Sequence, residues 1–131
     1  MEKTRKDTPG QTPFDIKERT FQFAVRIVRL CNTLPSTVAG REIARQLIRA
    51  GTSIGSNMQE ADAAVSKRDF VNDVRISRKE ARETHYWLKI IQAVGLVQDP
   101  EVPLLRDESW ELVLVLSAII RSATSHATHK K

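Results

Sequence analysis

Carboxylates, histidines and arginines are the residues of this sequence that could do chemistry, and we consider metal binding first. Helical bundles hold paired metal ions with Glu-x-x-His motifs on facing helices. Here Arg82 stands three residues before His85, and Glu83 stands only two before it. Glu80 and Glu83 form a carboxylate pair, but no second acidic-histidine set accompanies them. We therefore predict no metal site.

The remaining motifs of catalysis and cofactor binding are also missing from the sequence. His126 and His129 lie three residues apart near the C-terminus, where they form either a weak metal patch or part of a solvated tail, and we favour the tail. No P-loop, dinucleotide-binding glycine motif, zinc-ligand spacing or nucleophile elbow occurs. We expect no catalytic residue, no cofactor and no enzymatic activity.

Basic residues give the stronger functional signal, since the chain carries a formal net charge of +5. One cluster has a spacing of four residues, which places it on one face of a helix, and a second cluster follows about 30 residues later. Such faces neutralise nucleic-acid phosphates, but they are also common as solvated surfaces that pair with nearby glutamates. The candidate nucleic-acid-binding residues are Arg41, Arg45, Arg49, Arg75, Arg78, Lys79 and Arg82. Tyr86 and Trp87 could stack on bases, although Trp87 also fits a packing stripe with Ile90 and Val94.

Hydrophobic periodicity predicts four helices that position these residues, over about residues 14–33, 38–64, 67–94 and 106–125. Residues 1–13 are polar and broken by prolines and a glycine, which predicts a disordered arm. Residues 126–131 are predicted to form a flexible basic tail, so the bundle domain is expected over 14–125. Ser66 is expected to cap the third helix, and Gly95 to end it.

Small residues in the second and third helices indicate close helix packing. Gly51 and Gly55 lie inside the second helix, where another helix is expected to approach closely. The third helix has a seam with spacings of four and three, typical of a left-handed bundle. The seam consists of Phe70, Val74, Ser77, Ala81, Thr84, Leu88 and Ile91.

The run Leu112–Ile120 is apolar on every side, so a helix there needs cover all round. A buried strand is the alternative, but no partner strand is evident, and the helix is favoured. We expect one face to pack inside the bundle and the other to meet a second subunit. The candidate interface residues are Leu112, Leu114, Leu116, Ile119 and Ile120.

The chain is expected to be cytoplasmic. Its N-terminus lacks the apolar segment of a signal peptide, and its longest apolar run is far shorter than the roughly 20 residues of a membrane span. The single cysteine, Cys31, cannot form an intramolecular disulfide and is expected to be a small core residue in a reducing compartment.

Two segments carry a family resemblance: RQLIRAGTSIGSNMQEA (Arg45–Ala61) and SKRDFVNDVRISRKEARETHYWLKIIQAVGLV (Ser66–Val97). They resemble the bacterial four-helix bundle proteins first described from intervening sequences in large-subunit ribosomal RNA genes. The resemblance implies an all-α, antiparallel up-down four-helix bundle that assembles as a homo-oligomeric ring, typically a pentamer. It also implies kinship with the accessory variability proteins of diversity-generating retroelements, basic pentamers that bind reverse transcriptase and nucleic acid. The chain departs from the pattern where Ala61-Asp62 replaces a common glycine.

Polar residues in these segments have two interpretations. Asn57 and Glu60 lie three apart near small residues, so they are expected to be semi-buried and hydrogen-bonded to an arginine such as Arg75 or Arg78. We favour a structural polar network over a binding site. Its members are Ser53, Asn57, Glu60 and Glu83.

The sequence therefore favours a non-enzymatic, oligomeric helical scaffold. We expect it to contact RNA, DNA or a nucleoprotein partner such as a reverse transcriptase through its basic face, with no membrane partner. The alternative is a protein-protein interaction module whose charge serves solubility. The leading hypothesis rests on the similarity of the expected fold and charge to those of the related family.

Overall fold

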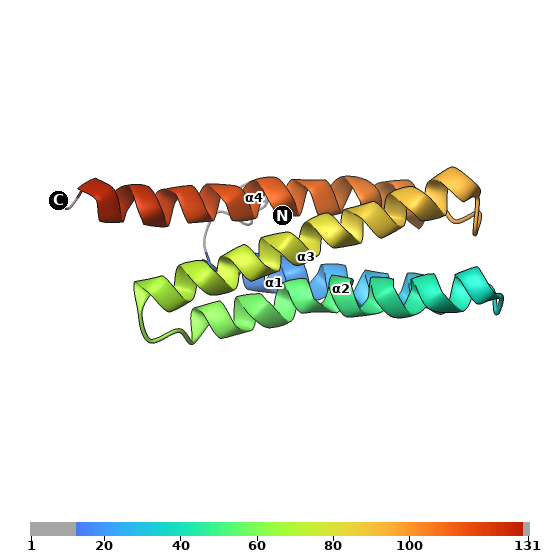
Figure 1. The fold of residues 1–131 in the computed structure, drawn as a ribbon, viewed down its shortest axis with the longest axis horizontal. Helices are drawn as coiled ribbons and strands as arrows, with labels where there is room; N and C mark the ends of the chain where they lie inside the picture. The colour runs from blue at the N-terminus through green and yellow to red at the C-terminus, as the bar shows by residue number, and fades with distance from the viewer. Residues whose placement is uncertain (1–12, 130–131) are drawn as a thin grey trace, which may run out of the picture.

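The computed structural model describes residues 13–129, which form four long helices and no strand. They are α1 (Pro13–Cys31), α2 (Val38–Asp62), α3 (Lys67–Val94) and α4 (Glu101–His129). Successive helices run in opposite directions along a shared long axis (Figure 1). The predicted all-α, antiparallel up-down four-helix bundle is confirmed. The predicted arm, up to residue 12, and the last two residues of the predicted tail lie outside the described residues.

Local structure explains where α2 and α3 begin and where α3 ends. The Thr37 hydroxyl accepts a hydrogen bond from the Gly40 amide, and the Ser66 hydroxyl accepts one from the Asp69 amide at 3.1 Å. Each satisfies an amide that has no partner within the helix. Gly95 ends α3 with φ of 62°, a left-handed conformation that costs glycine little. The predicted Ser66 cap and Gly95 stop are confirmed.

The start of α4 differs from the prediction. The fourth helix was expected to begin at about residue 106, but it already begins at Glu101 and contains Pro103 in its first turn. Amides of the first helical turn have no intrahelical acceptor, so a proline there loses no hydrogen bond. Asp99 supports this start, because its carboxylate accepts a hydrogen bond from the Glu101 amide at 2.9 Å.

Glycines allow α1 and α2 to approach closely, as predicted. A Cβ atom at Gly51 would lie 2.8 Å from Cγ2 of Ile27, and one at Gly55 would lie 3.3 Å from the carbonyl oxygen of Thr20. Toward α3, the carbonyl oxygen of Ile54 accepts a hydrogen bond from the buried Ser77 hydroxyl at 2.8 Å. The middle of α2 is therefore held between two helices by close packing and one interhelical hydrogen bond.

All four helices contribute large side chains to one core. The predicted α3 seam is buried from Val74 to Ile91, while Phe70 at its start is half-buried. The largest fully buried side chains from the other helices are Ile16, Phe23, Ile27, Leu47, Ile54, Met58, Leu105, Leu112 and Leu116. Within the described residues no helix is long and apolar enough to cross a membrane.

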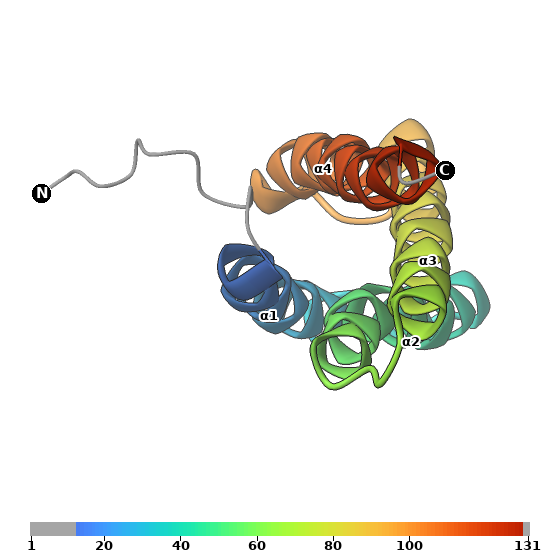
Figure 2. The same ribbon diagram turned by 90° about the vertical axis from the view of Figure 1, so that its left-hand side faces the viewer.

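Helices α1 and α4 form the loosest edge of the bundle. Viewed end on, α1, α2, α3 and α4 follow one another around the core, and α4 lies apart from α1 (Figure 2). Two ion pairs connect these helices: Arg19 with Glu108 at 2.7 Å, and Arg26 with Glu101 at 2.8 Å. The pKa of Arg19 is raised, chiefly by its hydrogen bonds to Glu108.

Candidate nucleic-acid interface

The predicted basic residues of α2 are largely engaged within the protein. Arg41 donates a hydrogen bond to the carbonyl oxygen of Ser36, and Arg45 pairs with Glu42 at 2.7 Å. The pKa of Glu42 is lowered, first by a hydrogen bond from Gln46 and then by this pairing with Arg45. Only the short-range pairing with Glu42 could be read from the sequence. Arg45 and Arg49 therefore have their positive charges partly neutralised, because each contacts a glutamate.

Arg49 bridges α2 to the acidic edge of α3. It lies 2.7 Å from an oxygen of Glu83 and 3.8 Å from Oε1 of Glu80, which is buried and has no hydrogen-bond partner among the described residues. The same Glu83 carboxylate accepts a hydrogen bond from the Trp87 indole at 3.3 Å. Trp87 is therefore a half-buried packing residue rather than a free aromatic surface.

Basic residues on the other edge of α3 lack such compensation. Arg78 donates to the Ser117 hydroxyl of α4 at 3.2 Å, but Arg75, Lys79 and Arg82 have no carboxylate within ion-pair distance in the described part of the chain. The structure thus divides the predicted basic residues into an α2 set that is mostly paired and an α3 set that is not.

Two further basic residues belong to the α3 set, although the sequence analysis did not single them out. Arg68 and Lys89 are exposed and, like Arg75 and Arg82, have no ion-pair partner among the described residues. These four residues are spaced by seven, or about two helical turns, so they form one row roughly 31 Å long. The seven-residue spacing was the signal available in the sequence. We define the α3 basic face as Arg68, Arg75, Arg78, Lys79, Arg82 and Lys89.

Contacts between α3 and α4 fix the direction of this face. Arg78 meets Ser117, His85 meets Trp110, and Arg106 of α4 donates to Gln92 at 2.9 Å. The α3 members of these contacts are spaced by seven and lie beside the basic row. Opposite charge is concentrated on the other edge of α3, toward α2, where Glu80 and Glu83 receive Arg49. Helix α3 is therefore segregated by charge: acidic toward α2 and basic toward α4 and solvent.

The ring contact between His85 and Trp110 is a feature that the sequence analysis missed. The ring centroids are 5.3 Å apart, with an interplanar angle of 51°, and 44% of Trp110 remains exposed. The pKa of His85 is lowered, first by desolvation and then by the nearby charges of Arg106 and Lys89, while Asp107 opposes the shift. A neutral imidazole therefore lies against the tryptophan at neutral pH.

The structure does not form the predicted polar network. Asn57 donates to the carbonyl oxygen of Ser53, within α2, and Ser53 donates to that of Arg49. Glu60 is exposed and meets neither Arg75 nor Arg78, because the helical register turns it toward solvent. Only Glu83 takes part in an interhelical contact, so the expected network is corrected to local bonds and one ion pair.

The predicted oligomer-interface residues fall into a buried group and an exposed group. Leu112, Leu116 and Ile120 are buried inside the single chain, so assigning them to a subunit interface was wrong: they line the core. Leu114 is 49% exposed and Ile119 is half-buried. These two remain available for contact with a partner.

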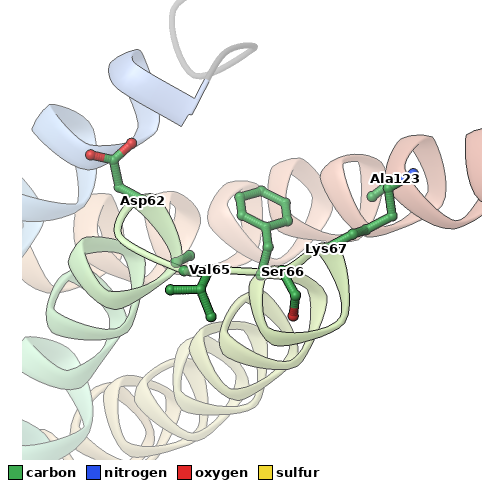
Figure 3. A pocket seen from close by; sticks show the side chains of 8 residues that line it. Asp62, Val65, Ser66, Lys67 and Ala123 are labelled. Carbon is green, nitrogen blue, oxygen red and sulfur yellow. The ribbon is translucent and has the colours of Figure 1, made fainter.

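A shallow apolar hollow of about 470 Å³ lies at the end of the bundle, beneath the α2–α3 turn (Figure 3). Val65 in the turn is almost fully exposed, and Ala123 of α4 lines the opposite side. Asp62, the acidic residue that lines the hollow, is paired with Lys17 at 2.7 Å. No group of three or more potential metal ligands occurs among the described residues.

Comparison with known proteins identifies the family to which the chain belongs. The family model of the 23S rRNA-intervening sequence proteins matches residues 13–118, which include α1, α2, α3 and most of α4. The chain belongs to this family. A solved structure of a Bacteroides thetaiotaomicron protein, described as having unknown function and as a member of the S23 ribosomal protein family, is 34% identical to this chain. It aligns over 83% of this chain and 97% of its own, with a TM-score of 0.74. Among curated proteins, none matches this chain.

Proposed function

We propose that this intervening-sequence family member is a non-enzymatic, cytoplasmic scaffold that binds nucleic acid through the α3 basic face. The observation that carries the proposal is the lack of carboxylate partners for Arg68, Arg75, Lys79, Arg82 and Lys89 among the described residues. When unpaired cations in a row contact phosphates, they displace the counterions bound to the nucleic acid, and this release favours association. The α2 arginines contribute less, because Arg45 and Arg49 already contact glutamates.

Self-association is the second part of the proposal. Leu104 is 56% exposed, and it shares one edge of α4 with the half-buried Val115 and Ile119, at spacings of 11 and 15 residues. We propose that this edge packs against another copy of the chain in a homo-oligomeric ring, with five copies as the family resemblance implies. A ring would repeat the α3 basic face and raise the apparent affinity for a long nucleic acid.

Binding of labelled structured RNA and duplex DNA across a salt series tests the proposal. The logarithm of the association constant is expected to fall linearly with the logarithm of salt concentration. The double variant Arg75→Glu/Arg82→Glu should bind far more weakly, with the slope reduced by about two because two phosphate contacts are lost.

Arg41→Glu/Arg45→Glu is the matched control. Both double variants lower the formal net charge by four, from +5 to +1, so a non-specific charge effect would weaken them equally. We expect the control to retain most of the binding. Equal losses would refute a defined α3 face. Absent wild-type binding at physiological salt would refute nucleic-acid binding and favour the alternative, a protein-protein interaction module.

A further inference from the structure

We propose that Trp110 and Tyr86 make the α3 basic face a site for unpaired RNA, with bases stacking on the two rings and phosphates contacting the basic row between them. This inference rests on the proposed function and specifies its ligand. Tyr86 is 58% exposed and Trp110 is 44% exposed. Exposed aromatic side chains beside unpaired cations are what proteins use to hold single strands.

The helical register places the basic row between the two rings. Trp110 lies against His85, which marks the α4 side of α3. Arg82 and Lys89, three residues before and four residues after His85, lie about one turn away on either side. Tyr86 follows His85 by one residue, about 100° further round the helix, and so lies beyond Arg82 and Lys89. A strand that follows the row therefore meets an aromatic ring on each side.

Contacts within the protein hold both rings in place. His85 contacts Trp110 with ring centroids 5.3 Å apart, and because its pKa is lowered it does so as a neutral ring. Tyr86 contacts Trp87 edge to face, with centroids 5.7 Å apart, and Trp87 is itself bonded to Glu83. Supported rings lose little side-chain entropy when a base stacks on them.

The ligand follows from what these groups can and cannot contact. Bases inside a duplex are stacked on each other and present only their edges, so an exposed ring gains nothing from them. RNA presents unpaired bases in loops, bulges and ends, where aromatic side chains stack on them. A second copy of this chain fits the surface less well, because a two-fold self-contact would place the basic row of one copy against that of the other.

Tryptophan fluorescence provides the test. The chain has two tryptophans, so Trp87→Phe leaves Trp110 as the single reporter. The probes are a uridine-rich RNA strand and the same strand annealed to its complement. We expect the unpaired strand to quench Trp110 and the duplex to leave it unchanged.

Trp110→Ala should weaken binding of the unpaired strand by roughly ten- to a hundredfold and leave duplex binding unchanged. Trp110→Phe keeps an aromatic ring and should retain much of the affinity, whereas Leu114→Ala removes apolar surface alone and should have little effect. Equal losses for both probes, or no quenching, would overturn the stacking proposal. Duplex binding with a normal salt slope would then still support the proposed function, and absent binding of both probes would overturn both proposals. If Trp110→Ala instead dissociates an oligomer, Trp110 is a subunit contact and the proposal is wrong.

Discussion

Replacing Gly51 with alanine separates helix propensity from helix packing in the middle of the bundle. Propensity alone predicts that alanine in a helix interior stabilises the protein by about 1 kcal/mol. The new Cβ would lie 2.8 Å from Cγ2 and 3.0 Å from Cγ1 of Ile27. Ile27 is fully buried, and its β-branched side chain has one preferred rotamer in a helix, so it cannot turn away. Overpacking of this kind costs about 1–3 kcal/mol.

The net expectation for Gly51→Ala is a loss of about 1 kcal/mol in the free energy of unfolding. Urea denaturation followed by circular dichroism measures it, with an unchanged m-value as the sign that only stability has changed. Ala118→Gly, at an exposed position of α4, measures the propensity contribution in the same protein. In an Ile27→Ala background the two closest atoms, Cγ2 and Cγ1, are gone and Cβ remains at 3.2 Å, so Gly51→Ala should become less destabilising or stabilising by up to about 1 kcal/mol. If Gly51→Ala stabilises the otherwise unchanged protein, the reasoning about close α1–α2 packing is refuted.

Three further predictions address other parts of the fold. Gly40→Ala should lower stability by about 3 kcal/mol in urea unfolding, because its Cβ would overlap the backbone carbonyl oxygen of Pro35, which cannot move aside as a side chain can; a neutral result would contradict this. Ser77→Ala should cost about 1 kcal/mol by removing the buried hydrogen bond to Ile54, whereas Ser53→Ala, which loses only a local bond, should cost less; equal effects would argue against the interhelical bond. Burial raises the pKa of Cys31 to about 11. Alkylation of the folded protein should therefore be slow at neutral pH, faster as the pH approaches that value, and fast once the protein unfolds. Rapid alkylation of the folded chain at neutral pH would refute the burial of this thiol.

Features set by neighbouring residues were predictable from the sequence. The Ser66 cap and the Gly95 stop depend on hydrogen bonds and backbone angles within a few residues, and both occur as expected. The start of α4 was not predictable in this way, because Pro103 is compatible with a loop or with a first helical turn. The helical start is favoured by the hydrogen bond that the Glu101 amide donates to the Asp99 carboxylate and by burial of Val102 and Leu105.

The candidate site depended on contacts between residues distant in the sequence. Pairing of Arg45 with Glu42 follows from their spacing, but Arg49 and Glu83 are separated by 34 residues and meet only after α2 and α3 pack. The exposure of Trp110 depends on the register of α4 against α3. Glu60 was misplaced for the same reason, since small neighbours indicate close packing without showing which side of α2 is covered.

The weak edge between α1 and α4 has a consequence for the order of folding. Nearly all close packing joins helices that are neighbours along the chain, so each helical hairpin can form from local contacts with a small loss of loop entropy. The pairs Arg19–Glu108 and Arg26–Glu101 close the sequence-distant edge, and the more exposed of the two, Arg26–Glu101, adds little stability in water. During synthesis, α1, α2 and α3 can therefore pack before α4 leaves the ribosome, and the last helix then docks on α3 rather than returning to the first. This contact pattern favours folding in sequence order, as in a short repeat array.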